Sequence, residues 1–327
     1  MMKLFLTGGT GFFGKSILHY LKSRHLTSNH EAAFEIVVMS RNPHLFLKHH
    51  PEFSACPWLR LQRGDIQEPN SFPFKEEFTD VLHAAADSLD IQGLTPLNRF
   101  DQIVNGTRNV LDFAVKINAE RFLLTSSGGV YGPQPTYMPS IPETYLGMPD
   151  SLNANNVYGV AKRQAELLCA IFAGQSNLQI KIARCFAFVG PDLPLSAHFA
   201  IGNFIKNALY DQEIIVEGDG TPLRTYLYQE DLARWLIEIL QRGKSGQAYN
   251  VGSHESISIG DLAKLVGMIL APEKPVVIKG VPKGIDRNCY IPDVYKAREA
   301  LGLKPAYSLR EAIELTGNII QKRSRLA

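Results

Sequence analysis

Two side chains that could move a proton lie four residues apart, at Tyr158 and Lys162. Residues four apart share one face of a helix, and the pattern over residues 157–173 predicts a helix there. A nearby ammonium group lowers the pKa of a phenol, so Tyr158 could act as an acid or a base near neutral pH. Tyr158 is the only one of the twelve tyrosines with a lysine at this spacing. One such match arises by chance about half of the time, so the pair needs support from its surroundings.

A polar turn ahead of this helix supplies that support. The apolar run 121–125 predicts a buried strand that leads into Ser126, Ser127 and the glycines Gly128 and Gly129. A serine hydroxyl from this turn could hold a substrate oxygen while that oxygen gains or loses its proton. The carbon that carries this oxygen would then exchange a hydride with a nicotinamide cofactor.

The signal for such a cofactor lies at the N-terminus. A strand expected at residues 3–7 runs into Gly8, Gly11 and Gly14, and a helical pattern begins at once. Gly8 lets the strand turn, Gly11 lets the backbone approach a pyrophosphate, and Gly14 lets the helix pack against the strand. The helix N-terminus offers free N–H groups to the phosphates. The sequence therefore predicts a dinucleotide site.

The end of the second expected strand bears on which dinucleotide binds. A carboxylate there holds the ribose hydroxyls of NAD, whereas a basic residue accommodates the extra phosphate of NADP. The chain has Ser40 and Arg41 at this point and no acid. A guanidinium matches a phosphate well, so we expect NADP and keep NAD as possible. Two later strand ends, at Asp65 and at Ala84 and Ala85, could border the adenine and the rest of the cofactor.

The elements that must position these residues alternate along the first two thirds of the chain. Strands are expected at residues 3–7, 35–40, 59–63, 81–84, 121–125, 180–183 and 248–251. Helices are expected between them at residues 14–23, 99–118 and 157–173. Such alternation with buried apolar strands predicts an α/β fold with a doubly wound parallel sheet of the Rossmann type.

The character of the chain changes from about Pro191 onward. Helical patterns at residues 203–210, 229–240, 260–269 and 308–321 are joined by links rich in proline and glycine. We expect residues 1–185 to form the cofactor domain, whose sheet also takes the strand near 248–251. Residues 186–327 would form mostly a smaller, interleaved α+β substrate-binding domain.

Composition excludes several other classes of protein. The 327 residues are 45% apolar, which is enough for a substantial core. The net charge is +2, and the basic residues Lys322, Arg323 and Arg325 are interpreted as a frayed, solvated chain end. We therefore expect no nucleic-acid or membrane binding. The four cysteines lack metal-ligand spacing, so we expect them reduced and no metal site. With no apolar stretch long enough to span a bilayer and no cleaved signal peptide expected, a soluble cytoplasmic protein is predicted.

Ten short motifs carry a resemblance that covers nearly the whole chain. Thr-Gly-Gly-Thr-Gly-Phe-Phe-Gly stands at residues 7–14, Thr-Ser-Ser-Gly-Gly-Val-Tyr-Gly at 125–132 and Tyr-Gly-Val-Ala-Lys at 158–162. The others stand at residues 64–65, 83–85, 105–109, 216–224, 228–233, 250–253 and 290–298. In these motifs the chain resembles an extended short-chain dehydrogenase/reductase of the NAD-dependent epimerase/dehydratase family. The last four motifs are similar to its nucleotide-sugar branch.

The resemblance implies roles for individual residues. It implies that Ser127, Tyr158 and Lys162 are catalytic and that Asn203, Arg224 and Arg287 bind the nucleotide-sugar substrate. The cofactor-binding residues implied by the motifs and by the strand ends are Gly8, Thr10, Gly11, Phe12, Phe13, Gly14, Arg41, Asp65, Ile66, Ala84, Ala85, Asn105, Tyr158 and Lys162. It also implies a homodimer through the helices at 99–118 and 157–173, with Ile103, Val110, Leu111, Leu167, Leu168 and Ile171 as the apolar stripe.

One departure from the family bears on the reaction. The 4,6-dehydratases of the family carry an Asp-Glu pair after the catalytic Ser or Thr, where this chain has Gly128 and Gly129. We therefore expect hydride transfer at C4 or a neighbouring carbon of a nucleotide-linked sugar, as a 4-epimerase or a keto-sugar reductase. A 4,6-dehydratase that uses another acid, such as Glu143, remains the alternative. A non-catalytic NADP-binding regulator is the alternative of another class.

Overall fold

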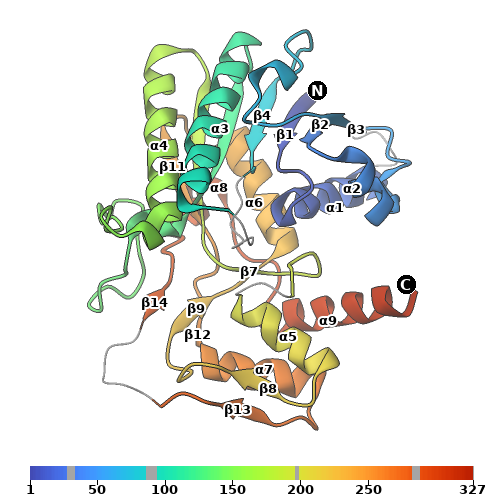
Figure 1. Cartoon of the computed structure of the whole chain (residues 1–327), viewed down its shortest axis with the longest axis vertical. Helices are drawn as coiled ribbons and strands as arrows, with labels where there is room; N and C mark the ends of the chain where they lie inside the picture. Colours follow the sequence, from blue (N-terminus) through green and yellow to red (C-terminus); the bar gives the residue numbers. More distant parts are fainter. Residues whose placement is uncertain (28–33, 86–93, 196–198, 282–287, 327) are drawn as a thin grey trace. The chain divides into compact units, whose positions relative to one another are not determined.

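A seven-stranded parallel sheet dominates the computed structural model of the chain (Figure 1). The structure describes residues 1–27, 34–85, 94–195, 199–281 and 288–326. The strands follow the order β11-β6-β5-β4-β1-β2-β3. Their bounds are β1 Met2–Thr7, β2 Phe34–Ser40, β3 Leu59–Arg63, β4 Asp80–His83, β5 Arg121–Ser127, β6 Gln179–Cys185 and β11 Gln247–Val251.

These seven strands are the seven that the apolar runs predict, each end within two residues. β1 pairs in parallel with both β2 and β4, and the pairs β2–β3, β4–β5 and β5–β6 are parallel as well. The strand order reverses between β1 and β4, which makes their carboxyl ends the place where such sheets bind ligands. The expected α/β fold with a doubly wound parallel sheet is confirmed.

The described α-helices are longer than their sequence patterns by a few residues. Their bounds are α1 Phe12–Thr27, α2 Pro43–His49, α3 Pro96–Lys116, α4 Val157–Gln175, α5 Ala200–Tyr210, α6 Gln229–Arg242, α7 Ile259–Leu270, α8 Tyr295–Leu301 and α9 Leu309–Leu326. The sequence did not predict α2 and α8. Each has only seven residues, which is too short for an apolar period to be recognised.

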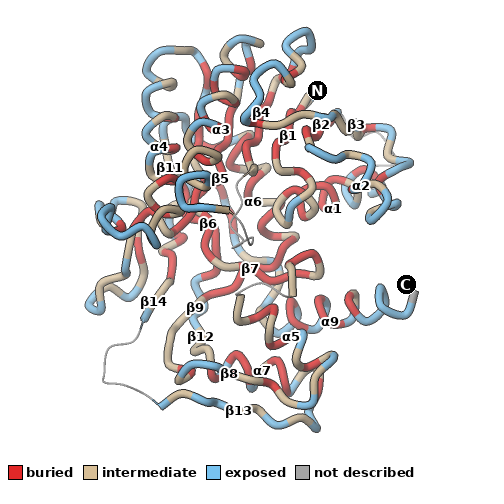
Figure 2. The backbone as a smooth tube through the Cα atoms, in the orientation of Figure 1, coloured by how far each residue is buried: buried red, intermediate tan, exposed pale blue. Residues whose placement is uncertain are grey.

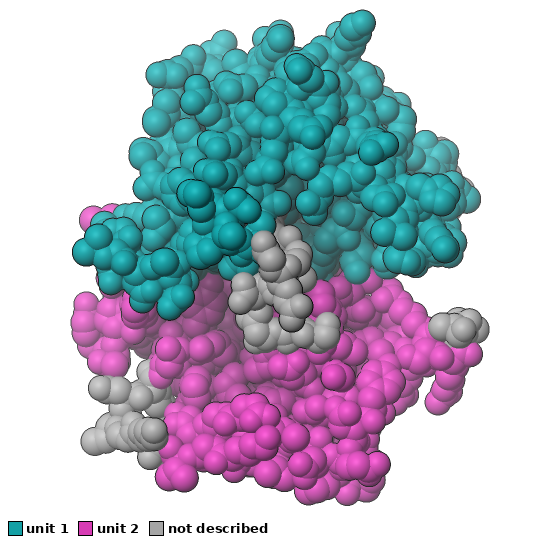
Figure 3. Space-filling view, viewed as in Figure 1, with its two compact units in different colours: residues 1–130, 148–185, 233–249 teal, residues 131–147, 186–232, 250–327 magenta. Residues whose placement is uncertain are grey.

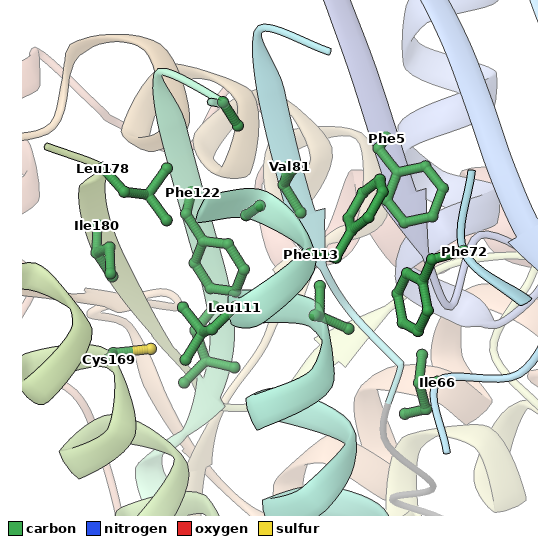
Figure 4. Packing of buried hydrophobic residues seen from close by; sticks show 14 of the residues in the cluster. Phe5, Ile66, Phe72, Val81, Leu111, Phe113, Phe122, Cys169, Leu178 and Ile180 are labelled. Carbon is green, nitrogen blue, oxygen red and sulfur yellow. The ribbon is translucent and has the colours of Figure 1, made fainter. Parts of the chain in front are cut away.

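Both faces of the large sheet are buried. On one face, Phe5 and Phe122 pack with side chains of α3 and α4 in the cluster of Figure 4. The residues adjacent to them on each strand point to the opposite face, and Leu4 and Leu123 are fully buried there. Figure 2 accordingly shows the central strands as buried along most of their length. Strands covered on both faces become continuous apolar runs in the sequence, which is why they were predicted well.

The chain divides into two compact units, which Figure 3 colours separately. The first unit contains residues 1–130, 148–185 and 233–249, and the second contains 131–147, 186–232 and 250–327. One boundary between the units lies after residue 185. Residues 131–147 lie in the second unit and residues 233–249 in the first, so the two units interleave along the chain.

The second unit is built from short strands and four helices of the described chain. Its strands are β7 Phe188–Val189, β8 Ile214–Val216, β9 Leu223–Thr225, β10 Leu227–Tyr228, β12 Ser256–Ser258, β13 Val276–Ile278 and β14 Cys289–Tyr290. They form the pairs β10–β7 and β13–β8 and the three-stranded sheet β12-β9-β14. The helices α5, α7 and α9 pack on one another.

The interpretation of the basic chain end was wrong for Arg323. Helix α9 continues to Leu326, so this end is not frayed. Arg323 Nη1 lies 3.0 Å from Oδ1 of Asp192, whose side chain is fully buried. Asp192 also accepts a hydrogen bond from Gln229 Nε2 at 3.0 Å. A charge that the sequence places in solvent therefore compensates a buried carboxylate.

The apolar residues expected at a dimer interface differ in how far they are exposed. Ile103, Val110 and Leu111 of α3 are at most 1% exposed and pack in the core of their own unit, so assigning them to an interface was wrong. Leu167 and Ile171 of α4 are 53% and 43% exposed. Within the described residues, no helix is long and apolar enough to cross a membrane.

Candidate functional site

The glycine loop after β1 has a geometry that only glycine fits. Gly8 has a φ of +73°, and a Cβ there would lie 2.4 Å from the carbonyl carbon of Ala84. A Cβ on Gly14 would lie 2.2 Å from the Cα of Gly9, so α1 begins in direct contact with the loop. The N–H of Gly11 donates to the carbonyl of Gly8 at 3.1 Å, which closes the turn. The loop is therefore a tight backbone cradle at the carboxyl ends of β1 and β4.

A cavity of about 420 Å³ opens beside this cradle, within the first unit. It is lined by Gly8, Thr10 and Gly11, by residues 39–42 at the end of β2, by Leu45, Phe46, His49 and His50 around α2, by Gly64, Asp65 and Ile66 after β3, and by Ala84, Ala85 and Gln102. Three successive strand ends and a glycine turn thus surround one elongated space. A space of this size and position suits the adenosine diphosphate part of a dinucleotide.

The structure brings most of the proposed cofactor-binding residues to this cavity. Those that line it are Gly8, Thr10, Gly11, Arg41, Asp65, Ile66, Ala84 and Ala85. Phe12, Phe13 and Gly14 form the first turn of α1 next to it. Asn105 is exposed on α3 and is not among the described residues that line the cavity.

Other residues of the α3 motif support the cavity, which the sequence did not predict. A Cβ on Gly106 would lie 2.6 Å from the side chain of Ile66, so α3 packs directly on that residue. Asn109 Nδ2 donates to the carbonyl of Ile66 at 2.9 Å. The motif around Asn105 was the only sign of these contacts, and it does not indicate which of its residues turn inward.

His83 fixes β4 between β1 and α3. The Thr107 hydroxyl donates to the carbonyl of Ile103 at 2.6 Å, so it accepts from Nε2–H of His83 at 3.1 Å. The other ring nitrogen, Nδ1, then accepts from the Thr7 hydroxyl at 2.7 Å. Burial lowers the pKa of His83 to about 3, and the nearby Lys162 ammonium adds to this effect. The ring is therefore neutral and structural, and it anchors the strand that ends at Ala84.

The turn after β5 packs closely on the start of α4, in the same unit as the cavity. The Ser127 hydroxyl is 8% exposed and accepts the N–H of Gly129 at 3.0 Å, so its own proton is available for another oxygen. A Cβ on Gly159 would lie 2.6 Å from the carbonyl oxygen of Gly129. Arg163 Nη1 donates to the carbonyl of Val130 at 3.1 Å and holds the end of this turn. Glycine pairs and one arginine thus bring the serine turn against the helix that carries Tyr158.

Lys162 is a buried cation one helical turn after Tyr158. It is 3% exposed, and its Nζ donates to the carbonyl of Thr125 at 2.7 Å. Its Nζ also lies 6.0 Å from the centre of the Tyr158 ring. Burial lowers the pKa of Lys162 to about 8, which the charge of Glu166 partly opposes. A lysine in this state can hold hydroxyl groups and stabilise a phenolate beside it.

Glu166 is a second supporting residue that the sequence did not predict. Arg184 of β6 donates from Nη2 to Glu166 Oε2 at 2.7 Å and from Nε to Oε1 at 3.0 Å. The Ser126 hydroxyl donates to Oε1 at 2.6 Å. Glu166 lies one turn after Lys162, so the sequence could indicate only that the two residues share a helix face. It could not indicate that Glu166 pairs with Arg184. The pair ties α4 to β5 and β6 beside the proposed catalytic lysine.

The proposed substrate-binding residues belong to the second unit or fall outside the description. Arg224 of β9 donates from Nη1 to the carbonyl of Asn288 at 3.0 Å and from Nη2 to its Oδ1 at 2.8 Å. Asn203 lies in the first turns of α5. Arg287 lies outside the described residues. Among the described residues, no group of three or more His, Cys, Asp or Glu side chains could hold a metal ion.

Comparisons with known proteins find matches that cover most or nearly all of the chain. The pattern of the NAD dependent epimerase/dehydratase family matches residues 4–252. UDP-glucuronic acid decarboxylase 2 of Arabidopsis thaliana is 29% identical over 315 residues, which cover 96% of this chain and 67% of that protein. UDP-glucose 4-epimerase of Thermotoga maritima, solved with UDP-glucose, has a TM-score of 0.82 at 24% identity, covering 99% of this chain and 100% of that one. A dTDP-glucose 4,6-dehydratase of Bacillus anthracis, solved with NAD, has a TM-score of 0.83 at 20% identity, covering 99% and 98%.

Proposed function

Because this chain belongs to the NAD dependent epimerase/dehydratase family, we propose that it transfers a hydride at C4, or at a neighbouring carbon, of a nucleotide-linked sugar. The proposed reaction is a 4-epimerisation or the reduction of a keto-sugar. The observation that carries the proposal is the placement of Ser127, Tyr158 and Lys162 in the unit that holds the glycine cradle and its cavity. The NAD seen with a dehydratase of the same fold agrees with a nicotinamide cofactor.

Each of the three residues has a separate task in this proposal. The Ser127 proton is available, since its oxygen already accepts the N–H of Gly129, and it is donated to the sugar oxygen. Tyr158 takes the proton of that oxygen during oxidation and returns it during reduction. Lys162 keeps Tyr158 acidic and orients the ribose of the cofactor. When bound, the nicotinamide ring accepts or returns the hydride.

The glycines after Ser127 argue against an ordinary 4,6-dehydration. That reaction removes the C5 proton and expels the C6 hydroxyl, and each step needs a positioned acid or base. Gly129 has no such group, and a Cβ there would lie 3.3 Å from the Ser127 hydroxyl. Glu143 is the remaining candidate acid. Burial raises its pKa, but its Oε1 accepts the N–H of Asn250 at 2.8 Å, so it has a structural role in the second unit.

Decarboxylation is a second candidate, favoured by the relative from Arabidopsis thaliana. Oxidation of a uronic acid at C4 places a ketone two carbons from the carboxylate. The C5–carboxylate bond can then break, its electron pair forming the enolate while carbon dioxide leaves. A proton is added at C5, and the hydride returns to C4. No acid is needed at C6, so Gly128 and Gly129 are compatible with this reaction.

One assay separates these reactions. The purified protein is incubated with UDP-glucose, UDP-glucuronic acid and dTDP-glucose, each with NAD⁺ or NADP⁺, and with their 4-keto derivatives plus NADPH or NADH. An isomer of unchanged mass indicates epimerisation, a gain of two hydrogens reduction, and a loss of carbon dioxide decarboxylation. Loss of one water would overturn the proposal in favour of the dehydratase. No turnover of any of them would favour the non-catalytic regulator.

We also propose that the protein forms a homodimer through the outer face of α4. The exposed Leu167 and Ile171 are one helical turn apart, so they form one apolar strip. Changing both to glutamate would place charges in the interface and should yield monomers by sedimentation. Wild-type protein that sediments as a monomer at micromolar concentration would contradict the dimer.

A further inference from the structure

A second cavity, of about 870 Å³, lies within the second unit, and we call it the α8 cavity. The described residues that line it are Tyr226 after β9, residues 253–255 between β11 and β12, Val294, Arg298 and Glu299 at α8, and residues 302–309 between α8 and α9. None of these residues lines the cavity beside the glycine cradle, and none has a task in the proposed reaction. The proposed function therefore leaves the α8 cavity without a role.

Two buried hydroxyl groups of the α8 cavity have protons that the described chain does not use. Tyr226 is 8% exposed and makes no hydrogen bond within the described residues. Burial raises the pKa of its hydroxyl, so the group stays protonated and can donate. Ser253 is 6% exposed, and its oxygen accepts the N–H of Glu255 at 3.2 Å, while its proton has no acceptor among the described residues. Because buried polar groups are nearly always paired, these two indicate a ligand with acceptor oxygens.

The start of α6 holds the loop at residues 302–309 in place. Asp231 is 1% exposed, and its Oδ2 accepts the N–H of Ala306 at 2.8 Å and that of Tyr307 at 3.3 Å. The Tyr307 hydroxyl donates to Glu230 Oε2 at 2.9 Å. Gly302, with a φ of +72°, ends α8 and begins the loop. This side of the cavity is therefore formed before any ligand binds, and the ring of Tyr307 offers it a fixed, flat surface.

The charges of the α8 cavity nearly cancel. Arg298 Nε lies 3.2 Å from Oε1 of Glu299, and both residues line the cavity. Lys304 and Glu255 are exposed and supply one further charge of each sign, and His254 is the remaining basic side chain of the described lining. A strongly charged ligand gains little from such a balance. A ligand rich in hydroxyl groups fits it better, because it can accept from the buried hydroxyls and donate to the carboxylates.

From these observations we propose that the α8 cavity binds an uncharged saccharide of two or more rings. Each sugar hydroxyl both donates and accepts, which matches the polar groups of the lining. The C–H faces of sugar rings can lie on Tyr307, Pro305 and Leu309, which supply apolar surface. The volume is near the upper end of the range of about 300–1,000 Å³ for small-molecule sites, which leaves room for more than one ring. The proposal goes beyond the proposed function and does not rest on it.

The test titrates three uncharged saccharides, cellotriose, maltotriose and chitotriose, into the full chain. Each is followed by saturation-transfer NMR at millimolar concentration, and wild type should bind at least one of them. Tyr226→Phe removes one buried hydroxyl but keeps the ring, and Ser253→Ala removes the other. Each change should weaken binding by about 3- to 10-fold, the usual contribution of one neutral hydrogen bond. If none of the three saccharides bound to wild type, the proposal would be overturned.

A matched control removes a tyrosine hydroxyl elsewhere. Tyr20 has the same 8% exposure as Tyr226, but it lies on α1 and does not line the α8 cavity, so Tyr20→Phe should leave saccharide binding unchanged. Tyr226→Phe should also keep the midpoint of thermal unfolding or raise it, because its hydroxyl has no partner to lose. A lower midpoint would mean that the hydroxyl is already bonded. That result, or equal weakening in Tyr20→Phe, would overturn the proposal.

Competition with UDP-glucose separates the α8 cavity from the proposed substrate site. A saccharide that stays bound at saturating UDP-glucose, and that both Tyr226→Phe and Ser253→Ala weaken, supports the proposal. Displacement by UDP-glucose would place the saccharide in the substrate site and overturn the proposal, as would an affinity that neither variant changes. Saccharide binding here by a protein that turns over no nucleotide sugar would support the proposal and count only against the proposed function.

Discussion

Two buried ion pairs lie in the first unit, one at each end of the parallel strands. The carboxyl-end cluster contains Ser126, Lys162, Glu166 and Arg184, and the amino-end cluster contains Asp80, Arg121, Lys181 and Gln241. In both, an arginine holds a carboxylate through two donors, and burial lowers the pKa of a lysine to about 8. The two clusters are similar in their electrostatics, although we assign chemistry only to one.

The difference lies in what surrounds each cluster. Asp80 is fully buried and accepts hydrogen bonds from Arg121, Thr79 and Gln241, so its oxygens are saturated by the chain. Lys162 instead follows Tyr158 on one helix face, at the strand ends where doubly wound sheets bind ligands. A lowered lysine pKa is therefore a poor guide to function by itself, and the end of the sheet at which the lysine lies is the better guide.

The largest expected effect is on turnover at the carboxyl end. Tyr158→Phe removes the hydroxyl that carries the proton but keeps the ring beside Lys162, so turnover should fall by about 10²- to 10⁴-fold. Cofactor binding and the midpoint of thermal unfolding should remain close to wild type. Steady-state rates on the substrate found in the mass-spectrometric assay measure this. Turnover within a few-fold of wild type would remove Tyr158 from the mechanism. The carboxyl-end cluster would then have no more claim to a chemical role than the amino-end cluster.

The next largest effect is on stability at the amino end. Asp80→Ala leaves Arg121 without its buried partner and should lower the free energy of unfolding by about 3–5 kcal/mol, measured in urea. The rate per folded molecule should not change. Glu120→Ala is the matched control, because Glu120 pairs with the same Arg121 but is 57% exposed, and it should cost under about 1 kcal/mol. Equal losses in the two variants would show that burial does not distinguish these pairs.

The sequence predicted the strands and the cradle better than the clusters. Strands buried on both faces are continuous apolar runs, and glycines such as Gly8 mark backbone geometry that no other residue adopts. The partners in the clusters have no such local signal. Arg184 lies 18 positions from Glu166, and Gln241 lies 161 positions from Asp80, so only the fold brings them together.

Contacts between residues far apart in the sequence were also missed at the cofactor cavity and at the chain end. Arg41 could be proposed for the cavity because it follows a strand directly, whereas His49 lines the cavity from α2, a helix too short to be recognised in the sequence. Asn105 was implied by a motif, but the motif's contact with Ile66 comes from Asn109 instead. Arg323 pairs with Asp192 across 131 positions, and a basic chain end carries no sign of that partner.

The smallest expected effect is on how stability depends on pH, which Lys181 and Lys162 should influence in the same direction. The pKa of Lys181 is about 8 in the folded chain and lies near 10.5 otherwise, so between these pH values the unfolded chain binds more protons. Stability from this residue therefore rises with pH across that window, and the cost of its buried charge is largest below pH 8. Lys181→Met removes the cost, so its advantage over wild type should shrink steadily from pH 8 to pH 10.

Lys162→Met sharpens this last test, because burial lowers the pKa of both lysines to about 8. Urea unfolding of both variants and wild type at several pH values should give the same direction of change for the two. Turnover should separate them, since Lys181→Met keeps the rate within about twofold while Lys162→Met loses it along with Tyr158→Phe. If the stability difference did not vary with pH, the lysine charges would be solvated and not buried. If both variants lost turnover, the amino-end cluster would belong to the mechanism, and position along the sheet would no longer separate structural from chemical charge.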